Sequence, residues 1–371
     1  MKRILHITYD MGIGGTEQVI NQLIRGMDKN VVEHHICCIE GSVGAIGQVL
    51  QNEGIGIEVL ARQPGFDWAL IKGIRQLINT HRIDIVHCHQ YTPWVYGWFA
   101  ALGTNAKVIF TEHGRFFPDR HRRKTWLINK LMAVTTAKIT AISKATKAAL
   151  VEYEFLPEHK IDVIYNGIEP LISTEAGRAK ARQELGIKPG QRVIGTVARL
   201  DPIKNQAMLL EAFTLLAPQF PDLVLLLVGD GPERQNLEQL ANKLNISERV
   251  IFAGFKSPAT DYMALMELFL LPSLSEGTSM TLLEAMSMEI PCVVSDVGGN
   301  PEVIHRPELG EVFPLTTPQA FAAIIQRWLM TNSAPQSKLQ RQHIFQQTFS
   351  VEVMSQHYQR YYQMANRSQE T

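Results

Sequence analysis

The sequence predicts an α/β protein made of two doubly wound parallel-sheet domains. Apolar strand-like runs alternate with amphipathic helical patterns through almost the whole chain, which favours this fold class. Several of the runs are continuously apolar instead of alternating, which is typical of parallel strands covered on both faces. With 371 residues the chain also exceeds the size of one ordinary core, so we expect two domains.

The first domain is expected to span residues 1–168. Its candidate strands lie at residues 3–9, 34–39, 57–60, 83–88, 106–111, 138–142 and 161–165. Between strands come helical patterns, the clearest with an apolar stripe made by Val19, Ile20, Leu23, Ile24 and Met27. Asn166-Gly167 and Pro170 then supply turn chemistry, which marks the domain boundary.

The second domain is expected to span residues 169–349. Its strands are predicted in "RVIGTVARL", "LVLLLVGDG", "RVIFAGF", "LFLLP", "PCVVSD" and "GEVFP". A helical pattern follows near the end of the chain, within residues 350–371, and no strand comes after it.

Composition and charge restrict the function. Lys plus Arg equal Asp plus Glu at 36 each, so nothing favours a nucleic-acid partner, whose binding depends on neutralising phosphates. No apolar run approaches the length of a membrane span, and His6 and Asp10 interrupt the first apolar stretch, which argues against a signal peptide. The four cysteines lack C-x-x-C spacing, and we expect buried thiols in a cytoplasmic protein.

The first glycine-rich turn, "MGIGGTEQVI", resembles a dinucleotide-binding loop only in part. Gly12 and Gly14 fit the G-x-G-x-x-G pattern, but Glu17 occupies the third glycine position. The loop also lacks the lysine of a phosphate-binding P-loop. This argues against a dinucleotide-dependent dehydrogenase and leaves a turn at Gly14-Gly15 where backbone can approach a ligand, with Thr16 able to cap the next helix.

The segment "LSEGTSMTLLEAMSM" places two carboxylates at one predicted helix start. Ser279 can cap a helix there, with Glu276 in the preceding loop and Glu284 on the second turn. The free N–H groups of residues 280–282 form an anion site, and carboxylates accept hydrogen bonds from sugar hydroxyls. Spacing alone also fits an exposed helix start with ordinary acidic residues.

The segment "ARLDPIKN" places two cations at a second predicted helix start. Asp201 can cap this helix, Pro202 fits its first position, and Lys204 lies in its first turn. Cations destabilise a helix start unless an anion compensates, so Arg199 and Lys204 are candidate phosphate clamps. Salt bridges to nearby acids are the competing explanation.

Together these segments resemble a retaining glycosyltransferase of family 4. "ARLDPIKN", "VGDGPE", "FAGF", "EGTSMTLLEAM" and "VGGNPEVI" carry the resemblance, and "TEHG" and "YNGI" extend it into the first half. The resemblance implies a GT-B fold with two Rossmann-like domains facing across a cleft. It also implies a C-terminal helix that crosses back to the first domain, a nucleotide-sugar donor held by the second domain, and an acceptor held by the first.

The resemblance also implies individual roles. Arg199 and Lys204 would bind the donor diphosphate, Glu276 the donor sugar, and Glu284 the ribose. His113, after a strand in the first domain, would lie near the reacting carbon. The remaining donor-site candidates are the phosphate-binding N–H groups of Met280, Thr281 and Leu282, the base pocket at Gly229, Phe252 and Gly254, and the first-domain turn at Gly14 and Gly15.

No metal or other cofactor is expected. The sequence contains no D-x-D pair to hold a divalent ion on the donor phosphates, so Arg199, Lys204 and the helix start must stabilise the leaving diphosphate. "HCHQ" offers His87, Cys88 and His89, but three adjacent strand residues cannot point the same way, and no second ligand cluster accompanies them. The resemblance implies retention of anomeric configuration.

A basic and aromatic segment follows His113. Basic residues mixed with aromatic ones can attach a protein peripherally to an anionic membrane carrying a lipid-linked acceptor, in this case at the inner face of the cell membrane. A solvated helix start with an aromatic anchor is the competing explanation. The candidate residues are Arg115, Arg120, Arg122, Arg123 and Lys124.

Donor sugar, base and acceptor stay open at this point. We expect transfer of a hexose-type sugar from a UDP- or GDP-sugar to a glycan or lipid-linked acceptor, in cell-surface polysaccharide or glycolipid synthesis. A nucleotide-sugar 2-epimerase of similar fold and a non-catalytic subunit of a transferase complex are the alternatives. The second is disfavoured because Arg199, Lys204, Glu276 and Glu284 are all present.

Overall fold

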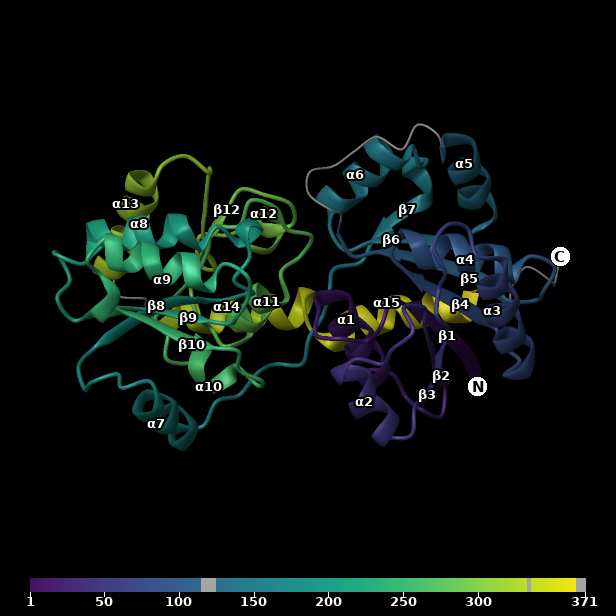
Figure 1. The fold of residues 1–371 in the computed structure, drawn as a ribbon, viewed down its shortest axis with the longest axis horizontal. Coiled ribbons are helices and arrows are strands. Elements are labelled where there is room, and N and C mark those ends of the chain that lie inside the picture. The colour runs from purple at the N-terminus through teal and green to yellow at the C-terminus, as the bar shows by residue number, and fades with distance from the viewer. Residues whose placement is uncertain (115–124, 332–334, 365–371) are drawn as a thin grey trace. The chain divides into compact units, whose positions relative to one another are not determined.

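The computed structural model describes residues 1–114, 125–331 and 335–364. It divides into two compact units, the first formed by Met1–Glu169 with Thr348–Thr371 and the second by Pro170–Gln347 (Figure 1). Each unit contains one parallel sheet with helices on both faces, which confirms the predicted fold class.

The first unit has a seven-stranded sheet in the order β3-β2-β1-β4-β5-β6-β7, in which neighbouring strands are parallel. Its strands lie close to the predicted runs. They are β1 (Lys2–Thr8), β2 (Val32–Cys38), β3 (Gly56–Val59), β4 (Ile85–His89), β5 (Lys107–Glu112), β6 (Lys138–Ala141) and β7 (Ile161–Val163).

A helix follows each of the first six strands, as in doubly wound sheets. The predicted apolar stripe after β1 lies on α1, where Val19, Ile20, Leu23 and Ile24 are buried. The helices are α1 (Gly15–Arg25), α2 (Ala45–Asn52), α3 (Trp68–Thr80), α4 (Tyr91–Ala101), α5 (Trp126–Thr135) and α6 (Lys144–Glu154), with a short 3₁₀ turn η2 (Glu158–Lys160).

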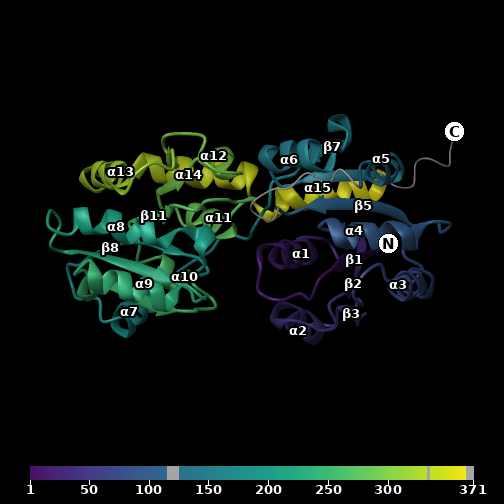
Figure 2. The ribbon, with the colours of Figure 1, turned by 45° about the horizontal axis from the view of Figure 1, so that its top comes forward.

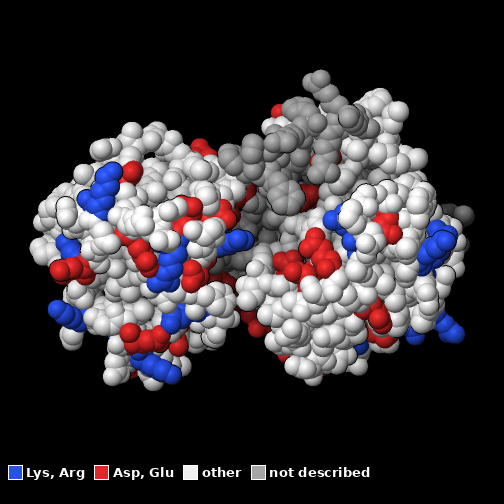
Figure 3. All heavy atoms as spheres, viewed as in Figure 1, with Lys and Arg blue, Asp and Glu red and all other residues white. Residues whose placement is uncertain are grey.

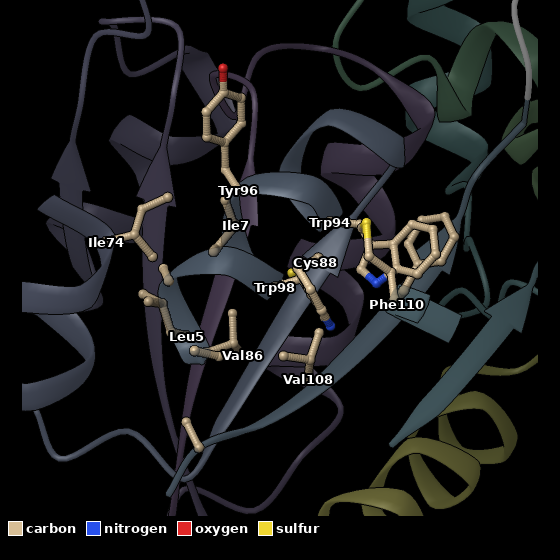
Figure 4. Close-up of a cluster of buried hydrophobic side chains, with 14 of the residues drawn as sticks. Leu5, Ile7, Ile74, Val86, Cys88, Trp94, Tyr96, Trp98, Val108 and Phe110 are labelled. Atoms are coloured by element: carbon tan, nitrogen blue, oxygen red, sulfur yellow. The ribbon is translucent and has the colours of Figure 1, made fainter. Parts of the chain in front are cut away.

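The two faces of this sheet differ in chemistry. On one face, side chains from β1, β4 and β5 form an apolar core with Trp94 stacked on Phe110 at 4.3 Å between ring centroids (Figure 4). Because side chains alternate along a strand, the intervening residues lie on the opposite face. There the strands carry the buried polar residues His6, His87 and His89.

The last helix, α15 (Val351–Met364), covers that polar face. Tyr362 Oη lies 2.8 Å from His87 Nδ1, and Tyr358 Oη lies 3.1 Å from Thr111 Oγ1, so the helix is anchored to β4 and β5 (Figure 2). A bridge between Ile168 and Ser350 joins its start to the chain leaving the first unit. The predicted return of the C-terminal helix to the first domain is confirmed.

The second unit has a six-stranded parallel sheet in the order β10-β9-β8-β11-β12-β13. The continuous apolar run predicted for its centre is β9, all of whose residues are buried. The strands are β8 (Arg192–Val197), β9 (Leu223–Val228), β10 (Val250–Gly254), β11 (Leu268–Leu271), β12 (Cys292–Ser295) and β13 (Gly310–Phe313).

The helices of the second unit include one that the sequence patterns did not indicate, α14, whose sequence is mostly polar and has no clear apolar stripe. The α-helices are α7 (Glu175–Glu184), α8 (Gln206–Leu216), α9 (Arg234–Lys243), α10 (Thr260–Met263), α11 (Met280–Ser287), α12 (Asn300–Val303), α13 (Pro318–Met330) and α14 (Pro335–Thr348). Two 3₁₀ turns, η3 (Pro202–Lys204) and η4 (Ser247–Arg249), complete the unit.

The cysteines and the helix lengths agree with what the composition predicts. All four cysteines are buried and free, as predicted. Among the described residues, no helix combines the length and the apolar character needed to cross a bilayer. On the face in view, acidic and basic side chains are interspersed over each unit (Figure 3).

Candidate functional site

An ion pair between Lys204 and Glu276 lies at the carboxyl ends of two neighbouring strands of the second unit. Lys204 follows β8 and Glu276 follows β11, and these strands are paired in the sheet. Lys204 Nζ lies 2.6 Å from Glu276 Oε1, and the Glu276 side chain is only 7% exposed. In parallel α/β sheets this edge is where ligands bind.

The loop that carries Lys204 differs from the predicted helix start. Asp201 caps a 3₁₀ turn, η3, by accepting from the N–H of Ile203, and Asn205 then adopts a left-handed conformation with φ of +54°. The α-helix α8 begins only after Asn205, so the placement of Lys204 in the first turn of an α-helix was wrong. The physical reason is that Asn tolerates the left-handed region and here redirects the chain.

Further hydrogen bonds fix this loop to the segment that follows β11. Asn205 Nδ2 donates to the carbonyl of Pro272 at 3.2 Å, and Leu274 N donates to the carbonyl of Ile203 at 2.7 Å. Ser273 Oγ also donates to Glu276 Oε1, at 2.7 Å. Both hydrogen bonds that the described residues donate to the Glu276 carboxylate reach Oε1, which leaves Oε2 to accept from a ligand hydroxyl.

Arg199 lies beside this pair but is held loosely. Its side chain is 72% exposed, and its nearest acid is Asp201, with 3.8 Å between Nε and Oδ2. Its backbone is better fixed, because the buried Gln206 donates to its carbonyl at 2.9 Å. An exposed ion pair at this distance contributes little, so the guanidinium is available to an anion.

Glycine at position 298 allows the Glu276 loop to pack tightly. Gly298 has φ of +52°, and a Cβ there would overlap the backbone carbonyl of Glu276. Gly299 N also donates to the carbonyl of Gly277 at 2.8 Å. The "VGGN" segment therefore supports the backbone that carries Glu276.

Helix α11 begins where the sequence predicted. Ser279 caps it by accepting from the N–H of Leu282 at 3.4 Å, so this N–H is already engaged. Among the described residues, the N–H groups of Met280 and Thr281 donate no hydrogen bond. These two groups are therefore the ones that α11 offers to an anion.

Glu284 lies on the second turn of α11 and is half-buried. Burial raises the pKa of its carboxyl group from 4.5 to about 7. A carboxylate desolvated in this way gains most from a ligand that donates hydrogen bonds to it.

The predicted base-pocket residues lie at the ends of β9 and β10. Gly229 has φ of +137°, and its N–H donates to the carbonyl of Gly254 at 2.9 Å, which joins the two strand ends. A Cβ at Gly229 would overlap the carbonyl of Ala198, the residue that follows β8. Phe252 packs under the Arg234 guanidinium at 5.8 Å from its ring centroid. The predicted donor residues of the second unit thus surround the carboxyl edge of its sheet.

In the first unit, Gly14 and Gly15 form the start of α1. Gly14 is the N-cap residue in an extended conformation, and no side chain caps the helix. The expectation that Thr16 caps it was wrong, because the helix begins one residue earlier and Thr16 is buried within its first turn. Glu17 is partly buried, and burial raises the pKa of its carboxyl group.

His113 follows β5 and is half-buried. Its Nε2 lies 2.8 Å from His89 Nδ1, and its Nδ1 has no hydrogen-bond partner among the described residues. Burial lowers the pKa of its imidazole to about 3, so the ring is neutral at physiological pH.

The first unit contains a histidine cluster that the "HCHQ" segment alone did not predict. His87 and His89 lie two residues apart on β4, so they share one face, and His6 on neighbouring β1 joins them. One ring nitrogen from each lies within 4.8 Å of the others, close enough for a metal-ligand set. The alternation of residues in "ILHIT" and "IVHCH" was the signal that could have predicted this.

The basic candidates Arg115, Arg120, Arg122, Arg123 and Lys124 lie outside the described residues. The adjoining helix α5 is described, and it exposes an apolar stripe. Leu127, Leu131 and Val134 are 72%, 53% and 65% exposed, and the Lys130 ammonium lies 4.3 Å from the Trp126 ring centroid.

Both halves of the chain match family models of glycosyltransferases. Residues 13–170 match the family model described as Glycosyltransferase Family 4, and residues 177–344 match the model described as Glycosyl transferases group 1. The chain is 27% identical over 309 residues to the N-acetyl-alpha-D-glucosaminyl L-malate synthase of Bacillus anthracis, covering 81% of this chain and 80% of that protein.

The chain is also similar to a second curated relative and to a solved structure, both of which are described with a UDP-sugar. The chain is 30% identical over 251 residues to the UDP-Gal:alpha-D-GlcNAc-diphosphoundecaprenol alpha-1,3-galactosyltransferase of Escherichia coli, covering 62% of this chain and 64% of that protein. The fold is similar to that of Anabaena Alr3699/HepE in complex with UDP-glucose, with a TM-score of 0.82, 23% identity, and 96% and 98% of the two chains covered.

Proposed function

The chain belongs to the family 4 glycosyltransferases, and from this premise we propose that it is a retaining, metal-independent hexosyltransferase that uses a UDP- or GDP-sugar. The chain is a GT-B glycosyltransferase, related to enzymes of polysaccharide and glycolipid synthesis. The acceptor we propose is a glycan or a lipid-linked glycan used for cell-surface polysaccharide or glycolipid.

The Lys204–Glu276 pair is the observation that carries the proposal. A lysine held at 2.6 Å from a carboxylate at a sheet edge is positioned before any ligand arrives. When a diphosphate binds, the ammonium can neutralise phosphate oxygens while Glu276 accepts from a sugar hydroxyl. One ion pair therefore supplies contacts to both parts of a sugar diphosphate.

Leaving-group stabilisation follows from the same residues. Negative charge grows on the diphosphate as the bond to the sugar breaks. Lys204, the exposed Arg199 guanidinium and the N–H groups of Met280 and Thr281 would meet that charge as fixed donors. These groups supply positive charge without a D-x-D carboxylate pair, which supports metal-independent transfer.

Glu284 and His113 complete the proposed roles. Glu284 accepts from the ribose hydroxyls, and the neutral His113 contacts the donor sugar near the reacting carbon. Retention of configuration rests on the family resemblance, with the leaving phosphate helping to take the acceptor proton.

The test is transfer with a panel of UDP- and GDP-sugars and diphosphate-linked lipid acceptors, with EDTA present. We expect a product with the anomeric configuration of the donor, read by NMR, at a rate that EDTA leaves unchanged. Inversion, or loss of activity that Mg²⁺ or Mn²⁺ restores, would contradict the proposal. Conversion of the donor sugar without any acceptor would instead identify a 2-epimerase.

We further propose that the first unit attaches to an anionic membrane from the cytoplasmic side. The exposed stripe on α5 and the neighbouring Trp126–Lys130 contact support this, because apolar and aromatic residues beside basic ones suit a lipid headgroup region. Liposome flotation with anionic lipid tests it. Leu127→Glu should abolish flotation, whereas Leu339→Glu, at a residue 68% exposed in the second unit, should not.

A further inference from the structure

Four histidines in the first unit form a continuous hydrogen-bonded row. His34 Nδ1 lies 2.9 Å from His6 Nε2, His6 Nδ1 lies 3.0 Å from His89 Nε2, and His89 Nδ1 lies 2.8 Å from His113 Nε2. We call these residues the histidine row. It crosses β2, β1 and β4 and ends just after β5, on the sheet face that α15 covers.

Strand register brings these residues together. His6 pairs with His87 across β1 and β4, and His89 pairs with Thr111 across β4 and β5. His34 lies opposite Ile4, two residues before His6, and therefore on the same face as His6. Three of the four rings thus lie on neighbouring strands of the sheet, and His113 follows directly on the next strand, β5.

Burial keeps the rings of the row neutral. It lowers the pKa of His34 to about 4 and that of His113 to about 3, and it lowers the pKa values of His6 and His89 well below 6.5. A neutral imidazole has one N–H donor and one acceptor nitrogen. Every hydrogen bond in the row must therefore run in the same direction.

Only two arrangements of the row satisfy this condition. Either every ring carries its proton on Nδ1 and donates toward His113, or every ring carries it on Nε2 and donates toward His34. In both, the terminal atoms His34 Nε2 and His113 Nδ1 lack a partner among the described residues. The arrangements differ in which end carries the unpaired N–H.

Both terminal nitrogens are buried, and a buried N–H without an acceptor is costly, so the N–H belongs at the end where a bound ligand would supply the acceptor. His34 is buried in the sheet, whereas His113 is half-buried and follows the carboxyl end of β5, at the edge where ligands bind. The first arrangement is therefore favoured, with Nδ1–H on all four rings.

A metal site is the other chemistry that clustered histidines suggest, and the contacts disfavour it. His6 and His89 each use both nitrogens within the row, and His87 uses both on Tyr362 and Thr111. No ring of the trio His6, His87 and His89 keeps a spare lone pair for an ion.

We propose that His6, His34 and His89 are positioning residues that hold His113 in its Nδ1–H tautomer, so that His113 presents a hydrogen-bond donor to an oxygen of the donor sugar. The contact with the sugar rests on the proposed function. The row itself does not, because its tautomer can be measured without substrate.

The experiment is ¹⁵N–¹H correlation NMR of the full chain labelled at histidine, which distinguishes Nδ1–H from Nε2–H rings. We expect the four rings of the row to share the Nδ1–H pattern. In His89→Phe, we expect His113 to lose this single pattern, and kcat for sugar transfer to fall about tenfold or more while KM for the donor changes less than twofold. His159→Phe, at an exposed histidine of the same unit, should change neither.

His6→Phe gives a second measurement, because it interrupts the row at a residue that is not hydrogen-bonded to His113. It should change the tautomer pattern of His113 in the same direction as His89→Phe. Mixed tautomers within the row of the wild-type protein, or a His113 pattern that both variants leave unchanged, would overturn the proposal. Stoichiometric zinc in the purified protein would also overturn it. A uniform row in a protein without transferase activity would refute the proposed function alone.

Discussion

The pKa of Glu284 yields a quantitative prediction about stability. Burial raises this pKa from 4.5 to about 7, so between these pH values the folded chain keeps a proton that the unfolded chain has released. The contribution of Glu284 to the free energy of unfolding therefore falls as the pH rises from 4.5 to about 7. Above pH 7 this contribution is constant. Glu284→Gln removes the carboxyl group and should remove this fall.

The magnitude follows from the same two values. A difference between 4.5 and about 7, at about 1.4 kcal/mol per pH unit, sets an upper limit of about 3.5 kcal/mol. Glu284 is half-buried, so solvent screening reduces the expected effect to about 1–2 kcal/mol. At pH 8 we expect Glu284→Gln to be more stable than wild type by this amount, and at pH 4 to be equally stable.

Urea unfolding between pH 4 and pH 8 measures this difference. Trp328 is the only tryptophan within residues 170–347, so ¹⁹F NMR of fluorotryptophan-labelled protein follows the second unit by itself. An equal pH dependence in wild type and Glu284→Gln would refute the reasoning.

Donor affinity should depend on pH in the opposite direction, because the ribose hydroxyls donate hydrogen bonds to the charged Glu284 carboxylate. Affinity for a nucleotide sugar should rise with pH up to about 7 in wild type and stay flat in the variant.

Three further predictions follow from the contacts. Lys204→Met should lower kcat for sugar transfer by roughly 10²–10³-fold through loss of charge stabilisation, whereas Lys243→Met, at an exposed lysine of α9, should keep normal steady-state kinetics. Gly298→Ala should destabilise the second unit by about 2–5 kcal/mol in urea unfolding, because its Cβ overlaps the Glu276 carbonyl. Gly186 has a similar φ of +66°, but a Cβ there would meet open space, so Gly186→Ala should cost only about 1–2 kcal/mol of stability. Equal losses of stability in the two variants would contradict the packing argument. The four buried thiols, whose pKa values burial raises, should resist a thiol reagent at pH 8 until the chain is unfolded, and rapid labelling of the native protein would contradict their burial.

Much of the fold could be predicted because burial leaves a strong local pattern. The continuous run "LVLLLV" is the fully buried central strand β9, and the Ser279 cap marks the start of α11. Turn geometry was harder to predict. Asn205 in the left-handed region replaces the predicted helix start by a 3₁₀ turn, and nothing in the local sequence distinguishes the two.

The candidate site was predictable where one segment carries several of its groups. Glu276 and Glu284 lie eight positions apart, so one predicted helix start placed them together. The Lys204–Glu276 contact depends on which strands are neighbours, and β8 and β11 are separated by two other strands in the chain. The histidine row depends on strand register across three pairings, which periodicity within one strand does not reveal.

The central claim is that the Lys204–Glu276 site binds the diphosphate of a nucleotide sugar. Calorimetric titration of the full chain with UDP-glucose, UDP-galactose and GDP-mannose tests it most directly. We predict saturable binding of at least one of them at a single site, weakened tenfold or more by Lys204→Met and unchanged by Lys243→Met. Binding that Lys204→Met leaves intact, or no binding of any nucleotide sugar, would contradict the claim.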